Sequence, residues 1–202
     1  MRKVLPLMLI VGLAAGLASA AVIDSNTSGA FSNTAFFGES FTTPGGGPFN
    51  NIAFNFFSDV PATTPTAGGT AFLLSQVYLG TPAGLTTATP GFLAQSTSIS
   101  SGRYLFSPSV TLQPNTKYFL YENAAILASG GNKITGGEGY FAFTSTGNFA
   151  TAQTIDLNGD LQSANFTLTA DTVVSAVPEP ATFGLMAIVF GLTGMAVRRR
   201  RA

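Results

Sequence analysis

The residues whose order most clearly suggests chemistry lie at the C-terminal end of the chain. Pro178, Glu179 and Pro180 are followed by a nearly uncharged apolar run over residues 181–197, and then by four basic residues: Arg198, Arg199, Arg200 and Arg201. Proline lacks a backbone N–H and restricts the residue before it, so the tripeptide stays extended and accessible. A short peptide presented in this way beside a membrane is suited to recognition by a processing enzyme.

The apolar run predicts a transmembrane helix. At about 1.5 Å per residue it would span about 25 Å, slightly less than the roughly 30 Å of a bilayer core. Arginine side chains can extend to the interface and make up this difference. We expect the four arginines to stay cytoplasmic and to act as a stop. A buried helix of a soluble core is the alternative, but it fits four terminal arginines poorly.

The N-terminal end predicts a secretory signal peptide. Arg2 and Lys3 precede a short apolar stretch, and Ala18 and Ala20 give a small-x-small cleavage site, with the cut before Ala21. A retained membrane anchor is the alternative, for which the apolar stretch is short. The Sec export machinery would then carry the chain, and both ends place the intervening residues across the inner membrane.

The three C-terminal features, in this order, resemble the PEP-CTERM sorting signal of Gram-negative bacteria. The resemblance implies that exosortase, a membrane-embedded enzyme, processes the exported chain near Pro178, Glu179 and Pro180. It also implies a transient anchor in the inner membrane and delivery to the cell surface or the extracellular matrix, with a link to exopolysaccharide and biofilm. Residues 41–44, 112–121 and 164–168 are weakly similar to parts of other small ectodomains that precede such signals.

The sequence therefore divides into a signal peptide (1–20), an ectodomain (21–175) and a sorting signal (176–202). The ectodomain contains three basic residues and eight acidic ones, a net charge of −5. This charge argues against nucleic acid as a partner. The chain has no Cys, so packing without disulfides must hold the ectodomain together.

The ectodomain has the pattern of an all-β domain. Ile52, Phe54 and Phe56 alternate with their neighbours, and further β-type runs lie at residues 70–79, 104–106, 110–112, 118–121, 140–143 and 164–168. Segments rich in Gly and Pro separate these runs. We expect a jelly-roll-like antiparallel β-sandwich of eight to ten strands.

Two local motifs predict how strands connect. Asn158 and Gly159 suit a type I′ turn and therefore a tight hairpin. Pro114 and Asn115 suit a turn before a strand that starts at residue 116, and the spacing to Tyr118 resembles the tyrosine corner of fibronectin type III and related sandwiches. We expect Tyr118 to be structural.

Few residues of the ectodomain suit catalysis or metal binding. The chain has no His, no Cys and no Trp, so the usual transition-metal ligands and Ser/His or Cys/His nucleophiles are missing. Asp156 and Asp160 give a fragment of a calcium loop, but Leu161 and Thr167 stand where that motif needs Gly and Glu. We expect neither a metal nor a cofactor.

Three classes of function remain open. The leading hypothesis is a structural or interaction protein of the extracellular matrix, without enzymatic activity. A carbohydrate-binding module or adhesin is the alternative, and an exposed row of tyrosines on one sheet face would favour it. A secreted hydrolase is the third, and it needs two carboxylates about 5–10 Å apart in a cleft. Two Asn-x-Ser/Thr sequons, at Asn26 and Asn165, are expected to be accidental.

Overall fold

The computed structural model describes residues 20–133, 141–144, 147–150 and 162–173. Within these residues the chain forms β-strands and one short 3-10 helix, η1 (Pro82–Gly84), and all paired strands are antiparallel. The prediction of an all-β fold with antiparallel sheets is therefore confirmed. The predicted signal peptide and transmembrane helix, residues 1–19 and 181–197, lie outside the described residues. Among those described, no helix has the length and the apolar character needed to cross a bilayer.

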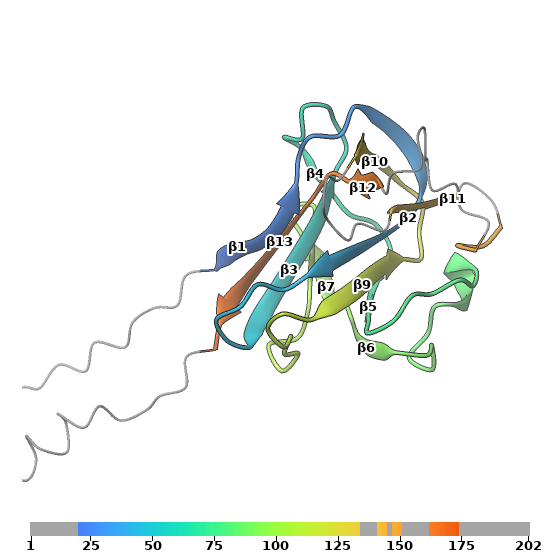
Figure 1. Cartoon of the computed structure of the whole chain (residues 1–202). Coiled ribbons are helices and arrows are strands. Elements are labelled where there is room, and N and C mark those ends of the chain that lie inside the picture. Colours follow the sequence, from blue (N-terminus) through green and yellow to red (C-terminus); the bar gives the residue numbers. More distant parts are fainter. Residues whose placement is uncertain (1–19, 134–140, 145–146, 151–161, 174–202) are drawn as a thin grey trace, which may run out of the picture.

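Two sheets make up the described fold (Figure 1). The first sheet contains, in spatial order, β1 (Ala21–Asn26), β13 (Phe166–Thr172), β3 (Phe49–Phe57), β8 (Arg103–Leu105) and β7 (Ser98–Ser100), with β4 (Pro65–Thr66) paired to β3. The second contains β12 (Gln162–Ala164), β10 (Ile126–Lys133), β2 (Phe31–Thr42), β9 (Lys117–Glu122), β5 (Ala71–Leu74) and β6 (Phe92–Gln95), with β11 (Phe141–Thr144) paired to β2.

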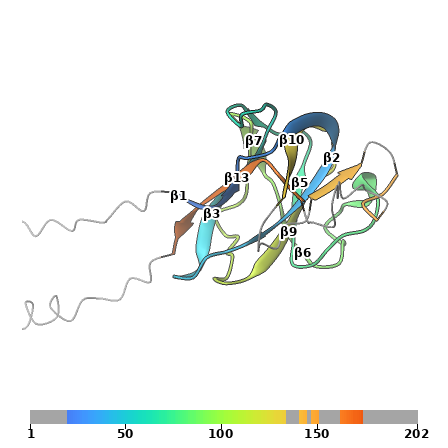
Figure 2. The same ribbon diagram turned by 45° about the horizontal axis from the view of Figure 1, so that its top comes forward.

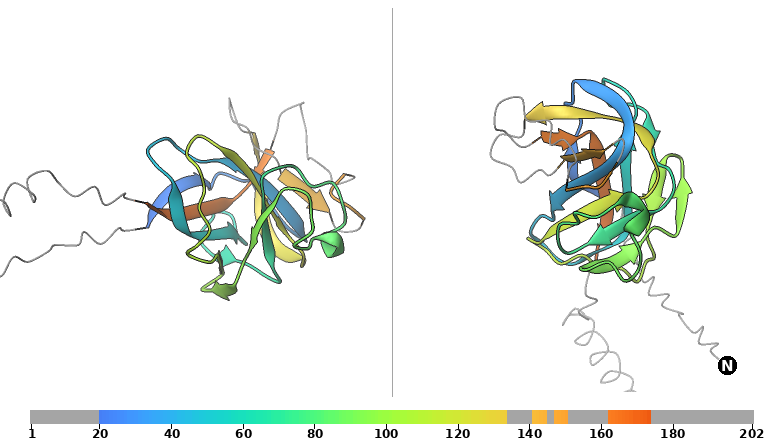
Figure 3. Two further views of the ribbon diagram at one scale, coloured as in Figure 1. Left: turned by 90° about the horizontal axis from the view of Figure 1, so that it is seen from below. Right: turned by 90° about the vertical axis from the view of Figure 1, so that its right-hand side faces the viewer.

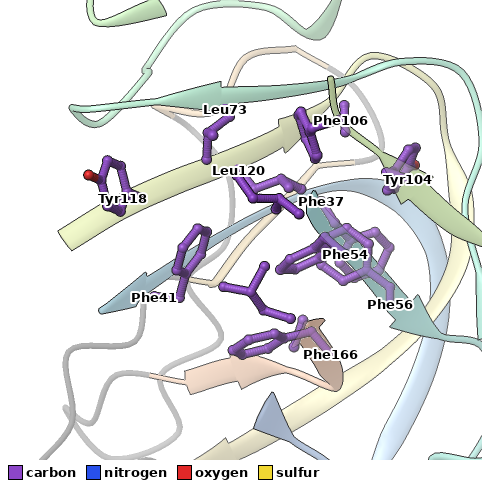
Figure 4. Close-up of a cluster of buried hydrophobic side chains, with 14 of the residues drawn as sticks. Phe37, Phe41, Phe54, Phe56, Leu73, Tyr104, Phe106, Tyr118, Leu120 and Phe166 are labelled. Atoms are coloured by element: carbon purple, nitrogen blue, oxygen red, sulfur yellow. The ribbon is translucent and has the colours of Figure 1, made fainter. Parts of the chain in front are cut away.

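The main hydrophobic core joins side chains from both sheets. The ring of Phe37 on β2 lies 5.6 Å from that of Phe56 on β3, and Phe41 and Phe54 repeat this contact at 6.3 Å. Phe166 on β13 stacks on Phe54 at 5.3 Å. Figure 4 shows these rings pointing toward one another from their strands. Each fully buried Phe stabilises the fold by about 1.5–3 kcal/mol relative to an exposed one, so this aromatic cluster is the main link between the sheets.

The two-residue period of β3 is confirmed. Ile52, Phe54 and Phe56 are all buried in the main core, as their alternation predicts. Strand-like composition was misleading elsewhere. In the run at residues 70–79 only Ala71–Leu74 forms a strand, and residues 110–112 contribute a single bridge, from Leu112 to Phe49.

The number of strands was also underestimated. The described residues contain thirteen strands, where eight to ten were expected. Several of them are only two or three residues long. Such short pairings leave little periodic signal in a sequence, because the side-chain alternation of a strand needs about four residues to be visible.

The predicted tyrosine corner is present. Pro114 and Asn115 form the turn, with Asn115 at a φ of 51°, and β9 begins at Lys117. The backbone N–H of Gln113 donates to the hydroxyl oxygen of Tyr118 at 2.8 Å. Thr43, at the end of β2, holds the same turn, since its hydroxyl accepts from the N–H of Thr116 at 3.0 Å. Tyr118 thus has the structural role expected of it.

Candidate functional site

Most residues predicted to act in sorting lie outside the described part of the chain. These are the motif residues Pro178, Glu179 and Pro180, the stop residues Arg198, Arg199, Arg200 and Arg201, and Ala18 of the cleavage site. Ala20 and Ala21 are described. Ala20 is exposed, and Ala21 is the first residue of β1. Among the described residues, the first strand therefore begins at the residue that follows the predicted cut.

The two ends of the described chain emerge at the same end of the molecule. β1 pairs antiparallel with β13, with Ala21 opposite Ala170, so the start of one strand lies beside the end of the other. The backbone N–H of Val173, just past β13, donates to the carbonyl of Pro48 at 2.8 Å. Figure 2 and the left view of Figure 3 show the start of β1 (blue) beside the end of β13 (orange-red) at one end of the fold.

This arrangement fixes where the sorting motif is attached. Val173 is the last described residue, and Pro178 follows five residues later in the sequence. Even a fully extended chain of this length spans at most about 18 Å. The described chain thus ends beside Ala21, the residue that signal cleavage would expose.

A second group of polar residues, which the sequence analysis did not single out, lies inside the fold. Glu39 on β2 and Glu122 on the neighbouring strand β9 have no exposed surface. Each follows the core-facing alternation of its strand, Glu39 between Phe37 and Phe41, and Glu122 two residues after Leu120. A carboxylate in step with buried apolar residues was the sequence signal that would have identified them.

Glu39 is held by three donors. Its Oε2 accepts from the backbone N–H of Ala164 at 2.6 Å and lies 3.0 Å from the hydroxyl oxygen of Ser163, and its Oε1 accepts from the N–H of Ser40 at 3.0 Å. Burial raises the pKa of Glu39 well above its ordinary value, and the nearby carboxylate of Asp24 adds to the rise. The hydrogen bonds oppose this shift.

Glu122 has fewer partners. Its Oε1 accepts from the backbone N–H of Phe37 at 2.9 Å, and its Oε2 lies 2.8 Å from the phenol oxygen of Tyr104 on β8. Burial raises the pKa of Glu122 well above the ordinary value, against the effect of these two contacts. Burial, followed by the charge of Glu122, also raises the pKa of Tyr104.

The two buried glutamates do not form the substrate cleft that a glycosidase needs. Such an enzyme places its carboxyl groups on opposite sides of a bound sugar, whereas Glu39 and Glu122 are enclosed and hydrogen-bonded to the fold. Asp156 and Asp160, the calcium candidates, lie outside the described residues. In the part of the chain that is described, no group of three or more His, Cys, Asp or Glu is placed to hold a metal ion.

The exposed row of tyrosines that would favour the carbohydrate-binding alternative is not formed by the tyrosines that the structure describes. Tyr104, Tyr118 and Tyr121 are buried. Tyr78 is partly exposed and packs edge-on against Tyr121, with ring centroids 5.8 Å apart. Tyr140 lies outside the described residues. The tyrosines of the described fold therefore act as packing residues, and they do not form a stacking platform for sugars.

The second sequon is enclosed as well. Asn165, at the bend between β12 and β13, is buried. Its Oδ1 accepts from the N–H of Gly29 at 2.6 Å, and its Nδ2 donates to the hydroxyl of Ser129 at 2.8 Å. These bonds connect the bend to the loop between β1 and β2 and to β10, and they hold the amide inside the fold. The expectation that this sequon is accidental agrees with its position.

The comparisons with known proteins match the C-terminal segment alone. Residues 176–201 match the family model of the PEP-CTERM protein-sorting motif. No curated protein and no solved structure matches the chain. The chain thus carries a PEP-CTERM sorting motif after a β-rich domain, and this motif implies an exported protein that exosortase processes in a membrane-associated step.

Proposed function

We propose that this protein is a structural or interaction component of the cell surface or extracellular matrix, linked to exopolysaccharide or biofilm and without enzymatic activity. The observation that carries the proposal is the sorting motif at residues 176–201, attached to a β-rich domain. A domain of this kind needs no cofactor or metal. The sorting motif supports the location of this domain outside the cell.

The processing steps follow from the two ends of the chain. A signal peptide over residues 1–20 is cut before Ala21, and the ectodomain of residues 21–175 then folds outside the inner membrane. Residues 181–197 anchor it there, with Arg198, Arg199, Arg200 and Arg201 on the cytoplasmic side. Exosortase recognises Pro178, Glu179 and Pro180 and releases the ectodomain. Both described ends lie at one end of the fold. This supports the proposed sequence of steps, because the rest of the ectodomain can then extend away from the membrane.

For the ectodomain we propose a jelly-roll-like antiparallel β-sandwich. The aromatic contacts between β2 of one sheet and β3 of the other support this arrangement. A sandwich without disulfides suits a protein that must fold after export, because folding then needs no oxidant.

The matrix role is tested by deleting the gene and measuring the polysaccharide retained by surface-grown cells. We expect less retained polysaccharide, with restoration by the wild-type chain and no restoration by a Glu179→Gln variant. Glu138→Gln is the matched control, since it makes the same change outside the motif. Unchanged retention in the deletion strain would contradict the role. Specific binding of the purified ectodomain on a glycan array would favour the carbohydrate-binding alternative.

A further inference from the structure

The phenol of Tyr104 lies at the centre of a buried hydrogen-bond network that joins three parts of the fold. Its oxygen accepts from the backbone N–H of Gly68 at 2.9 Å. The same oxygen lies 2.8 Å from the carbonyl oxygen of Gly68 and 2.8 Å from Oε2 of Glu122. The network connects β8, β9 and the loop between β4 and β5.

The number of protons in this network depends on the state of Glu122. A phenol has a single hydrogen. If Glu122 were ionised, that one hydrogen would have to serve both the Gly68 carbonyl and the carboxylate, and one of these acceptors would lose its donor. Gly68 is half-buried, so losing its hydrogen bond costs about 0.5–1.5 kcal/mol, whereas the Glu122 carboxylate is fully buried and would cost more if it lost its donor.

A protonated Glu122 satisfies every contact. Its Oε2–H then donates to the oxygen of Tyr104, the Tyr104 hydroxyl donates to the carbonyl of Gly68, and Oε1 still accepts from the N–H of Phe37. We propose that Glu122 is a neutral carboxylic acid in the folded protein at neutral pH and donates its proton to Tyr104, closing a latch between β9, β8 and the Gly68 loop.

The surroundings of Glu122 agree with this assignment. Tyr104 is the titratable group that faces it, and no cation or second carboxylate is among the interactions that shift its pKa. Burial is the largest of these, and burial disfavours the charged form. The surroundings of Glu39 are different from those of Glu122. Three donors, two of them backbone N–H groups, bind the Glu39 carboxyl, and the charge of Asp24 acts on it.

The latch makes the stability of the fold depend on pH. The pKa of Glu122 is raised in the folded state above the ordinary value of 4.5, so the folded protein keeps a proton that the unfolded chain releases. The contribution of Glu122 to the free energy of unfolding is therefore fully present below about pH 4.5. It is lost as the pH rises through the folded-state pKa. Once ionised, Glu122 competes for the Tyr104 proton, and the bond to Gly68 is lost.

Carbon-13 NMR of the full-length chain in detergent tests the proposal directly. The chain has four glutamates, so labelling their side-chain carboxyl carbons gives four signals: Glu39, Glu122, Glu138 and Glu179. Glu39→Gln, Glu138→Gln and Glu179→Gln assign three of them, and the Glu122 signal follows by elimination. We expect the Glu122 signal to titrate with a midpoint above pH 7. A midpoint at or below pH 7 would overturn the proposal.

A stability measurement gives a second readout. Glu122→Gln replaces the acid by a neutral group that can still donate to Tyr104. We expect the wild-type chain to lose unfolding free energy between pH 6 and pH 9, and the Glu122→Gln chain to lose clearly less, with Glu138→Gln behaving like the wild type. An equal loss in wild type and Glu122→Gln would contradict the latch. If Glu122→Gln does not fold, the NMR titration of the wild-type chain still decides.

Discussion

At the scale of single residues, Tyr118 shows how one hydroxyl fixes the entry into a strand. Its oxygen accepts from the N–H of Gln113 across the turn, and its ring packs 5.9 Å from Phe41 in the main core. The turn that it holds also bonds to Thr43, the residue that follows β2. One side chain therefore sets both the turn geometry and the position of β9 in the second sheet.

We predict that Tyr118→Phe lowers the free energy of unfolding by about 1 kcal/mol, because the N–H of Gln113 loses its acceptor while the ring stays in place. Tyr78→Phe is the matched control. The Tyr78 hydroxyl donates to the carbonyl of Thr81 at an exposed site, so we expect a change within about 0.5 kcal/mol. Denaturant unfolding measures both. Equal effects of the two substitutions would show that the corner does not stabilise the fold.

Single residues also mark the limit of what could be predicted from the sequence. The role of Tyr118 followed from its spacing to a turn, which is a local feature. The burial of Glu122 depends on Tyr104 and Phe37, which lie far from it in the chain. Such partners are brought together only by the sheet pairing, so the alternation of β9 can indicate that Glu122 faces the core, but it cannot show which groups bind its carboxyl.

At the scale of elements, β9 contributes to a hydrophobic cluster on each of its two faces. Tyr118 and Leu120 face the main cluster, whereas Tyr121 belongs to a smaller cluster with Phe149 and Phe72. Leu120 lies opposite Glu39 on β2 and Leu73 on β5. The central strand of this sheet is thus packed on both sides, and its substitutions should be costly.

We predict that Leu120→Ala destabilises the fold by about 2–5 kcal/mol, because it leaves a cavity among side chains of both sheets. The control is Leu127→Ala on β10. Leu127 is 47% exposed, so the same change should stay within about 0.5 kcal/mol. The comparison uses thermal or denaturant unfolding at one pH. A loss at Leu120 no larger than at Leu127 would contradict the position of the core.

The lengths of elements were harder to predict than their existence. β3 and β9 are long enough to show a period of two, and both were expected. In the run at residues 70–79, Ser75 donates its N–H to Gly91 and Tyr78 donates its N–H to the hydroxyl of Tyr121, so the chain leaves the strand and covers the sheet. A tertiary contact ends this strand, although its composition would allow it to continue.

At the scale of the whole molecule, the described fold pairs the strands nearest its two ends. Its core draws on strands from Ala21–Asn26 to Phe166–Thr172, which pair with each other. Among the described strands these are the first and the last, and β1 lies at the edge of the first sheet beside β13. The described fold therefore needs strands close to both of its ends.

We predict that a fragment of residues 21–175 folds alone as mostly β-structure. No Cys is present and no metal is expected, so neither reductant nor chelator should change its unfolding midpoint. Circular dichroism and thermal unfolding with and without a chelator measure this. A helix-dominated spectrum, or unfolding by the chelator, would show that the ectodomain has been wrongly delimited.

The order of the sorting motif, the apolar run and the arginines was visible in the sequence, because each part acts through local composition. Four arginines resist transfer across the membrane, at several kcal/mol each at the bilayer centre. Replacing Arg198, Arg199, Arg200 and Arg201 by neutral residues should therefore weaken retention, so that uncut protein passes the enzyme. Replacing Glu179 or the two prolines should leave an uncut, membrane-bound form.

Mass spectrometry of the surface-exposed protein tests the central claim most directly. The protein is isolated from a strain with active exosortase and from one without it, and its terminal peptides are identified. We predict an N-terminus at Ala21, a C-terminus at or near Pro178, Glu179 and Pro180, and intact C-terminal peptides only in the strain without exosortase. Peptides of residues 181–202 that persist on surface protein in the active strain would contradict the account and show a permanent anchor.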